Sequence, residues 1–287
     1  MNVREQGFLL LTSYLGDSRR KVLSTAQVRT LTNKMRGLPK PAEDRDLEES
    51  DLLELGYSPS MARRILELLA GEEQLHQYLQ AAHKNGCAPL TRITGAYPVV
   101  LHQKLGAEAP GCLWYKGDLS ILQNPGVALV GSRDLNDDNL HFAKEVGKQA
   151  ALQGICLISG NARGADRAAQ ESCLAWGGKV ISIVADELQK YYPRKNILYL
   201  SEEGFDLPFS AQRALNRNRI IHCLGEKVFV AQSSLYTGGT WRGTEANLQK
   251  RWTPVYCFYD RSEAVNALTA LGAAPIQAKD LEGLIAL

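Results

Sequence analysis

The hydrophobic pattern of the chain changes character near residue 86. In the first 85 residues, apolar side chains such as Leu9, Val28 and Leu31 recur at loosely helical intervals. We therefore predict a helical module over residues 1–85. The segment GLPKPAED at 37–44 is expected to be a turn or linker, because two prolines and a glycine interrupt any helix.

A second helical signal follows in LLELGYSPSMARRILELL, residues 52–69. Gly56 and Tyr57 close one short helix, and Ser58 or Ser60 caps the next, whose apolar face carries Ile65. Helix, glycine turn and helix together are compatible with a SAM-like or helix-hairpin-helix module. A plain helical bundle fits the same pattern equally well.

From residue 86 onward, short apolar runs alternate with helical stretches. Strands are predicted at 127–130, 155–159, 180–184, 228–231 and 255–258, and helices at 138–153, 163–176, 210–224, 241–251 and 262–271. This alternation predicts an α/β domain over 86–287, an extended Rossmann-like parallel sheet with helices on both faces. Right-handed crossovers then place the strand-to-helix loops on one edge, where ligands of such sheets bind.

Composition adds few constraints. The 287 residues are 45% hydrophobic, enough for an ordinary core, and the net charge of +2 means that any basic site must come from local clustering. Six scattered cysteines without a C-x-x-C pair predict reduced, buried thiols, and five dispersed histidines offer no metal constellation, so no cofactor is expected. The first residues do not follow the secretory pattern and no run approaches a membrane-spanning length, so we expect a cytoplasmic protein.

Three predicted strand-to-helix loops share one chemical character. The first carries Gly131, Ser132 and Arg133, and the second, SGNARGAD at 159–166, carries Ser159, Gly160 and Arg163; the third, TGGTWRGTEA at 237–246, carries Gly238, Gly239 and Arg242. Glycine lets a backbone approach a ligand closely, and helix N-termini favour anions, as does arginine. Each loop alone is also an ordinary capped turn, but three on one edge favour an anion site. Asp166 is interpreted as a helix-start residue or an internal partner of Arg163.

Two further segments add cations. YYPRKN supplies Arg194, Lys195 and Asn196, and ALNRNRIIHCL supplies Arg217, Asn218 and Arg219. The neighbouring aromatics Tyr191, Tyr192, Phe209 and Trp241 are expected either to stack on bases or to be core. The dinucleotide signature G-x-G-x-x-G and the P-loop signature are absent from the sequence.

In this order, the segments VALVGSR, SGNARGADRAAQ, YPRKN and RNRII, followed by RSEAVNALTALGAAPI, resemble the DprA/Smf family over about residues 90–277. The resemblance implies a binder of single-stranded DNA that dimerises through an extended Rossmann fold and helps to load a RecA-type recombinase. It also implies DNA contacts at Arg133, Arg163, Arg194, Lys195, Arg217 and Arg219, with no catalytic residue.

The sequence departs from the family at several places. Gln170 stands where the family usually has histidine, Gln232 stands in place of an acid, and TGGTWRGTEA replaces the usual turn after the fourth predicted strand. The family's common C-terminal winged helix is not expected in this chain, which stops at Leu287. A divergent paralogue in phage defence or nucleotide sensing is the alternative within the family.

Two other readings stay open. TGGTWRGTE also resembles the PGG-x-GT-x-x-E loop of nucleotide phosphoribohydrolases, in which Glu245 would assist departure of the base and Arg133 or Arg163 would hold the phosphate. The third reading is a sensor that binds a nucleotide-derived signal without turnover.

Overall fold

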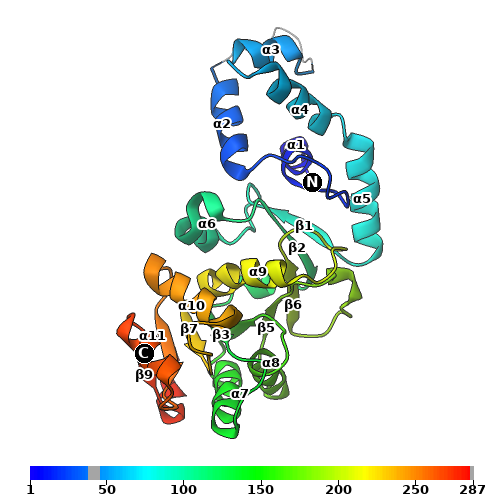
Figure 1. The fold of residues 1–287 in the computed structure, drawn as a ribbon. Helices are drawn as coiled ribbons and strands as arrows, with labels where there is room; N and C mark the ends of the chain where they lie inside the picture. The colour runs from blue at the N-terminus through cyan, green and yellow to red at the C-terminus, as the bar shows by residue number, and fades with distance from the viewer. Residues whose placement is uncertain (38–45, 285–287) are drawn as a thin grey trace.

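The N-terminal part of the protein is helical, as predicted. The computed structural model describes residues 1–37 and 46–284. The first helices are α1 (Val3–Thr12), α2 (Thr25–Met35), α3 (Glu49–Glu54), α4 (Pro59–Leu69) and α5 (Glu72–Lys84), and they occupy one end of the molecule (Figure 1). Apart from Gly37, the predicted linker at 37–44 lies outside the described residues.

The turn between α3 and α4 has the predicted chemistry. Helix α3 ends at Glu54, and Gly56 takes a φ of 75°, the left-handed conformation that glycine adopts without steric strain. Ser58 is the N-cap of α4, where its side chain accepts a hydrogen bond from the Met61 amide at 3.3 Å. Of the two candidate caps, Ser58 is therefore the one used.

The helical region has a core of its own and also packs on the rest of the protein. Phe8, Leu31, Leu52 and Ile65 are buried together between the helices. On α5, Tyr78 contacts the edge of Trp114, with ring centroids 5.2 Å apart, and joins the larger core of the sheet. The division of the chain into two domains at residue 85 stays a prediction.

A nine-stranded sheet, in the order β1-β2-β6-β5-β4-β3-β7-β8-β9, forms the rest of the frame. The strands are β1 (Ala88–Thr91), β2 (Cys112–Gly117), β3 (Gly126–Val130), β4 (Cys156–Ser159), β5 (Val180–Ile183), β6 (Ile197–Ser201), β7 (Lys227–Val230), β8 (Val255–Phe258) and β9 (Ala274–Ile276). All pairings from β6 to β9 are parallel, whereas β1 and β2 add antiparallel strands at one edge.

The five predicted strands are confirmed as β3, β4, β5, β7 and β8. Strands β1, β2, β6 and β9 were not predicted. Strand β2 pairs antiparallel with both neighbours, so no crossover helix marks it in the sequence. Strands β5 and β6 are joined only by the short 3-10 helix η3 (Leu188–Lys190), which left β6 without the expected α-helical signal.

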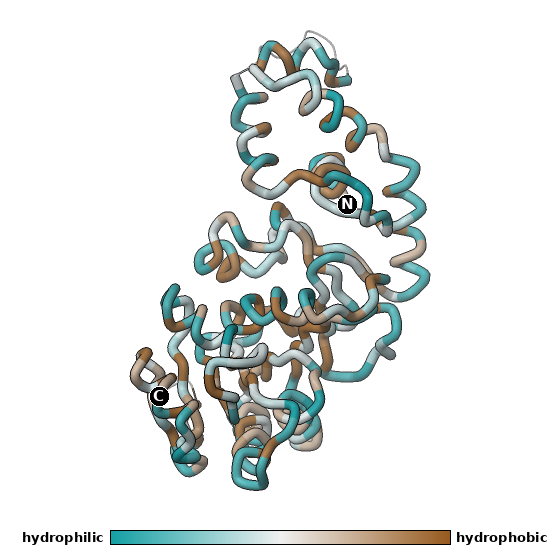
Figure 2. The backbone as a smooth tube through the Cα atoms, viewed as in Figure 1, coloured by the Kyte–Doolittle hydropathy of each residue, from teal (hydrophilic) through white to brown (hydrophobic). Residues whose placement is uncertain are grey.

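Helices cover both faces of the sheet, as predicted. Alternate residues of β3 show the two faces, because Val127 and Leu129 join one core cluster while Ala128 and Val130 join the other. The first face carries α7 (Asp137–Leu152) and α8 (Ala165–Ala175); the second carries α6 (Val99–Leu105), α9 (Ala211–Leu224), α10 (Gly238–Lys250) and α11 (Glu263–Ala270). Short 3-10 helices lie at Gly106–Glu108, Leu119–Gln123 and Ala278–Gly283. Figure 2 shows hydrophobic and hydrophilic positions interspersed along the chain, in the helices as well as in the sheet.

The strand order reverses between β3 and β7. From β3 the chain adds β4, β5 and β6 on one side, and β7, β8 and β9 follow on the other. In open α/β sheets this reversal opens a crevice at the carboxyl ends of the strands, which is the usual ligand site. The fold therefore places a candidate site after Val130 and Val230.

All six cysteines are buried free thiols, as predicted. Across residues 1–37 and 46–284, no helix has the length and apolar character needed to cross a membrane.

Candidate functional site

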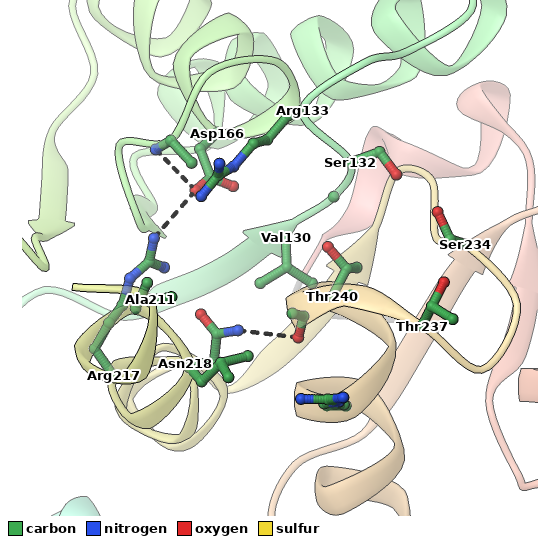
Figure 3. A pocket seen from close by; sticks show the side chains of 17 residues that line it. Val130, Ser132, Arg133, Asp166, Ala211, Arg217, Asn218, Ser234, Thr237 and Thr240 are labelled. Carbon is green, nitrogen blue, oxygen red and sulfur yellow. Dashed lines mark hydrogen bonds and ion pairs between the residues drawn. The ribbon is translucent and has the colours of Figure 1, made fainter. Parts of the chain in front are cut away.

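A pocket opens at the point where the strand order reverses. Its volume is about 440 Å³, and it lies between the loops after β3 and β7, the start of α8 and the first half of α9 (Figure 3). Its lining comprises Val130, Gly131, Ser132, Arg133, Ala162, Asp166, Ala211, Ala214, Leu215, Arg217, Asn218, Ser234, Thr237, Gly238, Gly239, Thr240 and Arg242.

A buried charged pair forms one wall of the pocket. The Arg217 Nη2 atom lies 3.8 Å from an Asp166 carboxylate oxygen and donates to the Gly160 carbonyl at 2.9 Å. The same Asp166 oxygen accepts from the amides of Gly160 and Ala162 at 3.2 and 3.1 Å. Asp166 thus joins the second glycine loop to α9 and fixes the position of the Arg217 guanidinium.

Glycines are required where the loops meet. A Cβ at Gly160 would overlap the guanidinium of Arg217. Gly164 has a φ of 85°, and a Cβ there would lie 2.5 Å from the Ser132 carbonyl oxygen. At Gly131 a Cβ would lie 2.5 Å from that of Ala165. These contacts explain why the first two loops carry glycine, since any side chain would force them apart.

Two helix N-termini are directed to the pocket. Helix α8 begins after Gly164 and α10 begins after Thr237, and neither N-cap residue makes a side-chain capping hydrogen bond. In α8, however, the amides of Ala165 and Arg167 already donate to the carbonyls of Ser132 and Ala162, both at 3.2 Å. The first amides of α10 have no such partner among the described residues and are therefore available to an anion. Asn218 donates to the Gly239 carbonyl at 3.0 Å, which ties α9 to the first turn of α10.

The pocket is positively charged. Arg133, Arg217 and Arg242 line it, and Asp166 is its one acidic lining residue. The side chains of Arg133, Asp166 and Arg217 point toward one another in Figure 3. Burial raises the pKa of Asp166, while Arg217 and the two amide donors oppose that rise. Because Asp166 is already hydrogen-bonded, the positive charge of Arg133 and Arg242 remains available for a ligand.

The structure brings together eight of the predicted site residues as pocket lining: Gly131, Ser132, Arg133, Arg217, Asn218, Gly238, Gly239 and Arg242. Gly160 lies directly behind Arg217 as its hydrogen-bond partner. The buried Ser159 accepts from Gln170 instead of facing the pocket.

The predicted pairing of Arg163 with Asp166 is wrong. Its exposed guanidinium pairs with Asp134 at 2.8 Å, and the residue does not line the pocket. The predicted partner of Asp166 was Arg163, but Asp166 faces Arg217, which comes from another helix. The helix-start position of Asp166, in the first turn of α8, is confirmed.

Arg194, Lys195 and Asn196 do not join the pocket. Asn196 donates to the Gly177 carbonyl at 3.2 Å, and its own carbonyl accepts from Val180, so this segment lies at the start of β5 and β6. The pocket lies at the opposite, carboxyl ends of these parallel strands. Arg194 and Lys195 are therefore separated from the pocket, because the chain returns across the sheet to the amino ends of the strands before it enters β6.

Arg219 also lies apart from the pocket. Its guanidinium forms an ion pair with Glu202 and also donates to the Asn216 carbonyl at 2.6 Å. Residues 217 and 219 differ by about 200° around a helix, so Arg217 and Arg219 face different sides of α9. Arg219 thus connects α9 to the end of β6.

The departures from the family pattern have local partners. Gln170 donates to Ser159 Oγ at 2.6 Å and lies 3.4 Å from Ser182 Oγ, so a buried amide bridges β4 and β5. Gln232 accepts from the Asn136 amide at 3.2 Å through its side chain and from Ser132 through its backbone carbonyl. Gln232 therefore supports the first glycine loop.

The predicted aromatic groups divide into two sets. Trp241 is buried, and Tyr191 is partly buried and stacked on Tyr199. Phe209 and Tyr192 are exposed, so their interpretation as core is wrong. Tyr236, which was not among the predicted site residues, is also exposed and contacts Trp241 edge-on.

Glu245, on which the phosphoribohydrolase reading depends, does not line the pocket. It lies two turns into α10, past the residues that reach the cavity. Within the described part of the chain, no group of three or more His, Cys, Asp or Glu side chains is arranged to hold a metal ion.

Comparison with known proteins gives a family match. A family model described as DNA recombination-mediator protein A matches residues 89–282. The DNA processing protein DprA of Streptococcus pneumoniae is 36% identical over 148 residues, which cover 46% of this chain and 50% of that protein. Protein Smf of Synechocystis is 27% identical over 210 residues, covering 67% and 52% of the two chains. The chain thus spans about half the length of these curated relatives.

Solved structures show the same fold. The crystal structure of DprA from Streptococcus pneumoniae matches with a TM-score of 0.74 at 23% identity, over 98% of both chains. A structure of DNA processing protein A from Helicobacter pylori, described with its single-stranded DNA binding mode, matches with a TM-score of 0.58 at 22% identity. That match covers 70% of this chain and 95% of the other.

Proposed function

Because this chain belongs to the DNA recombination-mediator protein A (DprA/Smf) family, we propose that it binds single-stranded DNA through the sheet-edge pocket and acts as a recombination mediator. The observation that carries the proposal is the chemistry of the pocket. Arg133, Arg217 and Arg242 meet the uncapped N-terminus of α10 around a cavity whose one acidic lining residue is already hydrogen-bonded. Such a site suits a phosphate group.

Exposed aromatic residues extend this chemistry to a nucleic acid. Phe209 is 54% exposed two residues before Ala211, which lines the pocket, and Tyr236 is 69% exposed beside Thr237. Both therefore lie near the pocket, on the two segments that face each other across it. An unpaired base can stack on such a side chain, whereas the bases of a duplex are stacked on one another. We therefore expect a preference for single strands.

The test is a titration of labelled single-stranded and duplex DNA by fluorescence anisotropy at several salt concentrations. Counterion release predicts a log–log slope of about −0.7 for each phosphate neutralised on a single strand. Arg133→Gln/Arg242→Gln is expected to weaken binding, while Lys84→Gln/Lys144→Gln removes the same charge at exposed sites away from the pocket and serves as control. Equal affinity for duplex, or equal losses in both variants, would contradict the pocket assignment.

The partner of this activity is proposed to be a RecA-type recombinase, with the chain acting as a homodimer. Both follow from the family and have separate tests. Recombinase assembly on single-stranded DNA should be faster with this protein present, and the Arg133→Gln/Arg242→Gln variant should lose that effect. Sedimentation at several concentrations should show a species twice the chain mass of 31.6 kDa.

The position of Glu245 supports binding over catalysis. A phosphoribohydrolase needs its glutamate next to the ribose, whereas Glu245 is not part of the pocket lining. We therefore expect no free base when nucleoside monophosphates are incubated with the protein and separated by chromatography. Base release by the parent protein that disappears in Glu245→Gln would contradict the DNA-binding proposal and favour a phosphoribohydrolase.

A further inference from the structure

A second positively charged cavity lies in the helical region, far along the chain from the sheet-edge pocket. It has a volume of about 670 Å³ and lies between the segment 19–21 and helix α4. Five of its ten lining residues are cations and one is an acid; the lining is Arg19, Arg20, Lys21, Ser58, Ser60, Met61, Arg63, Arg64, Glu67 and Leu68. We call this cavity the basic groove.

Two of the groove arginines are held in place by backbone carbonyls. Arg20 donates to the Leu10 carbonyl at 2.8 Å, as well as to Gln74, and Arg64 donates to the carbonyls of Lys21 and Val22 at 2.5 and 2.6 Å. Carbonyls orient a guanidinium without neutralising its charge, in contrast to a carboxylate.

The remaining charges of the groove are accessible. Lys21 and Arg63 are exposed, and neither forms an ion pair with an acid among the described residues. Arg19 alone pairs with an acid, Asp17, at 3.0 Å. With Glu67 as the one acid of the lining, the groove keeps a surplus of positive charge directed at solvent.

The lining favours a phosphodiester backbone over a peptide. Met61 and Leu68 are its only apolar residues, so it offers little to the side chains of a protein partner. Guanidinium groups donate in pairs to phosphate oxygens, and the exposed hydroxyls of Ser58 and Ser60 add neutral donors. These groups bind phosphate and sugar without reading a base sequence.

We propose that the basic groove binds the sugar–phosphate backbone of single-stranded DNA, as a second contact beyond the sheet-edge pocket. The proposal rests on the proposed function, because the strand held at the pocket supplies the DNA. A short strand fills only the pocket, whereas a longer one also reaches α4. Affinity should then rise with strand length until both sites are occupied.

The experiment compares two strand lengths and two double variants of the full chain. Lys21→Gln/Arg63→Gln removes exposed groove charges whose side chains do not support the fold beyond one 3.3 Å bond from Arg63 to its own helix. Lys84→Gln/Lys144→Gln is the control of equal charge. The probes are labelled oligothymidylates of about 6 and about 40 nucleotides, lengths near and well beyond a single binding-site size.

We expect the groove variant to bind the long strand about fivefold more weakly, with its salt slope reduced by about 1.4 for two lost phosphate contacts. Binding of the short strand should be unchanged, and the control should behave as the parent protein. Equal losses for both lengths, equal losses in the control, or no loss in the groove variant would each overturn the proposal.

Polyglutamate, added as a competitor, tests the alternative that the groove binds an acidic protein segment. If polyglutamate binds the parent protein and the groove variant loses that binding while retaining the long strand, the groove serves acidic protein segments and the DNA proposal falls. Failure of the parent protein to bind either strand would instead show that the proposed function itself is wrong, and the groove proposal would fall with it.

Discussion

The sheet-edge pocket and the basic groove both present arginines to an anion, but they hold these arginines differently. In the pocket, Arg217 is 8% exposed, faces a buried carboxylate 3.8 Å away and fills the space left by Gly160. In the groove, Arg64 is fixed by carbonyls while Arg63 is exposed. The pocket thus fixes one geometry through the protein core, whereas the groove supplies charge with less constraint.

The difference indicates what each region contributes. A charge held inside the core is coupled to folding, because its partner is left buried and unpaired if the charge is removed. An exposed charge contributes little to stability and acts through the phosphates that it neutralises. Substitution of the buried Arg217 should therefore change stability and binding together, whereas substitution of exposed cations such as Arg63 should change binding alone.

The largest effect is expected at the buried pair. Arg217→Met leaves Asp166 buried without its charged partner and should lower the free energy of unfolding by about 3–5 kcal/mol. Arg63→Met in the groove should change it by less than about 0.5 kcal/mol. Urea unfolding measures both, and Asp166→Asn/Arg217→Met should recover part of the loss. Similar stability of the two single variants would remove the distinction between the regions.

The second-largest effect is expected from lowering the pH, which should reduce stability through His222 on α9. His222 is fully buried with its Nδ1 3.1 Å from Asn247 Nδ2, and burial lowers its pKa from 6.5 to about 3. Because its folded pKa is below the unfolded value, the stabilisation is present above pH 6.5 and is lost as the pH falls toward 3. Between pH 6.5 and 4 the loss is about 3 kcal/mol.

The measurement is urea unfolding at both pH values, with His222→Gln as the comparison. The variant should lose about 3 kcal/mol less than the parent protein over this interval, whatever its stability at pH 6.5. The lining of the basic groove contains no histidine, so the comparison is specific to the buried core around α9. An identical pH dependence in parent and variant would show that His222 is not kept neutral by the fold.

A glycine in each region gives the third comparison. A Cβ at Gly160 overlaps the locked Arg217, and at Gly71 it lies 2.9 Å from Nη1 of Arg20. Gly160→Ala should destabilise by about 2 kcal/mol, since Arg217 has little room to move. Gly71→Ala, at the N-cap of α5, should cost less than about 1 kcal/mol. Thermal unfolding compares the stabilities of these variants. Gly95→Ala is the control, because a Cβ there meets nothing within 4 Å.

The sequence predicted local features well and long-range ones poorly. The five central strands and their helices have hydrophobic periods that are visible in short windows, and their loops carry the glycines of the pocket. By contrast, Asp166 and Arg217 come from different helices, so their pairing depends on packing that no local pattern records. The antiparallel strand β2 likewise lacks a crossover helix to mark it.

The placement of the cations shows the same limit. The motif YPRKN is recognisable, yet whether Arg194 lies at the pocket depends on the path of the chain between β5 and β6. That path returns to the amino ends of the strands, where Asn196 contacts Gly177. Arg219 differs from Arg217 by two positions on one helix, which is enough to direct it to Glu202. The basic groove was not predicted because its two segments, 19–21 and α4, are far apart in sequence.

Substitutions of two exposed arginines in adjacent loops should have the smallest effect on stability. They also give the most direct test of whether the DNA binds in the pocket. Arg133 lines the pocket, whereas Arg163 pairs with Asp134 and does not. Arg133→Gln should weaken binding of a short single strand about tenfold through loss of a charged phosphate contact. Arg163→Gln should weaken it less than about threefold, since an exposed ion pair contributes little. Both should melt within about 2 °C of the parent protein. Fluorescence anisotropy with a strand short enough to fill only the pocket measures this difference in affinity without a contribution from the groove.

If Arg163→Gln caused the greater loss of affinity, the DNA would have to follow the outer side of the second glycine loop, and the pocket would not be its main contact.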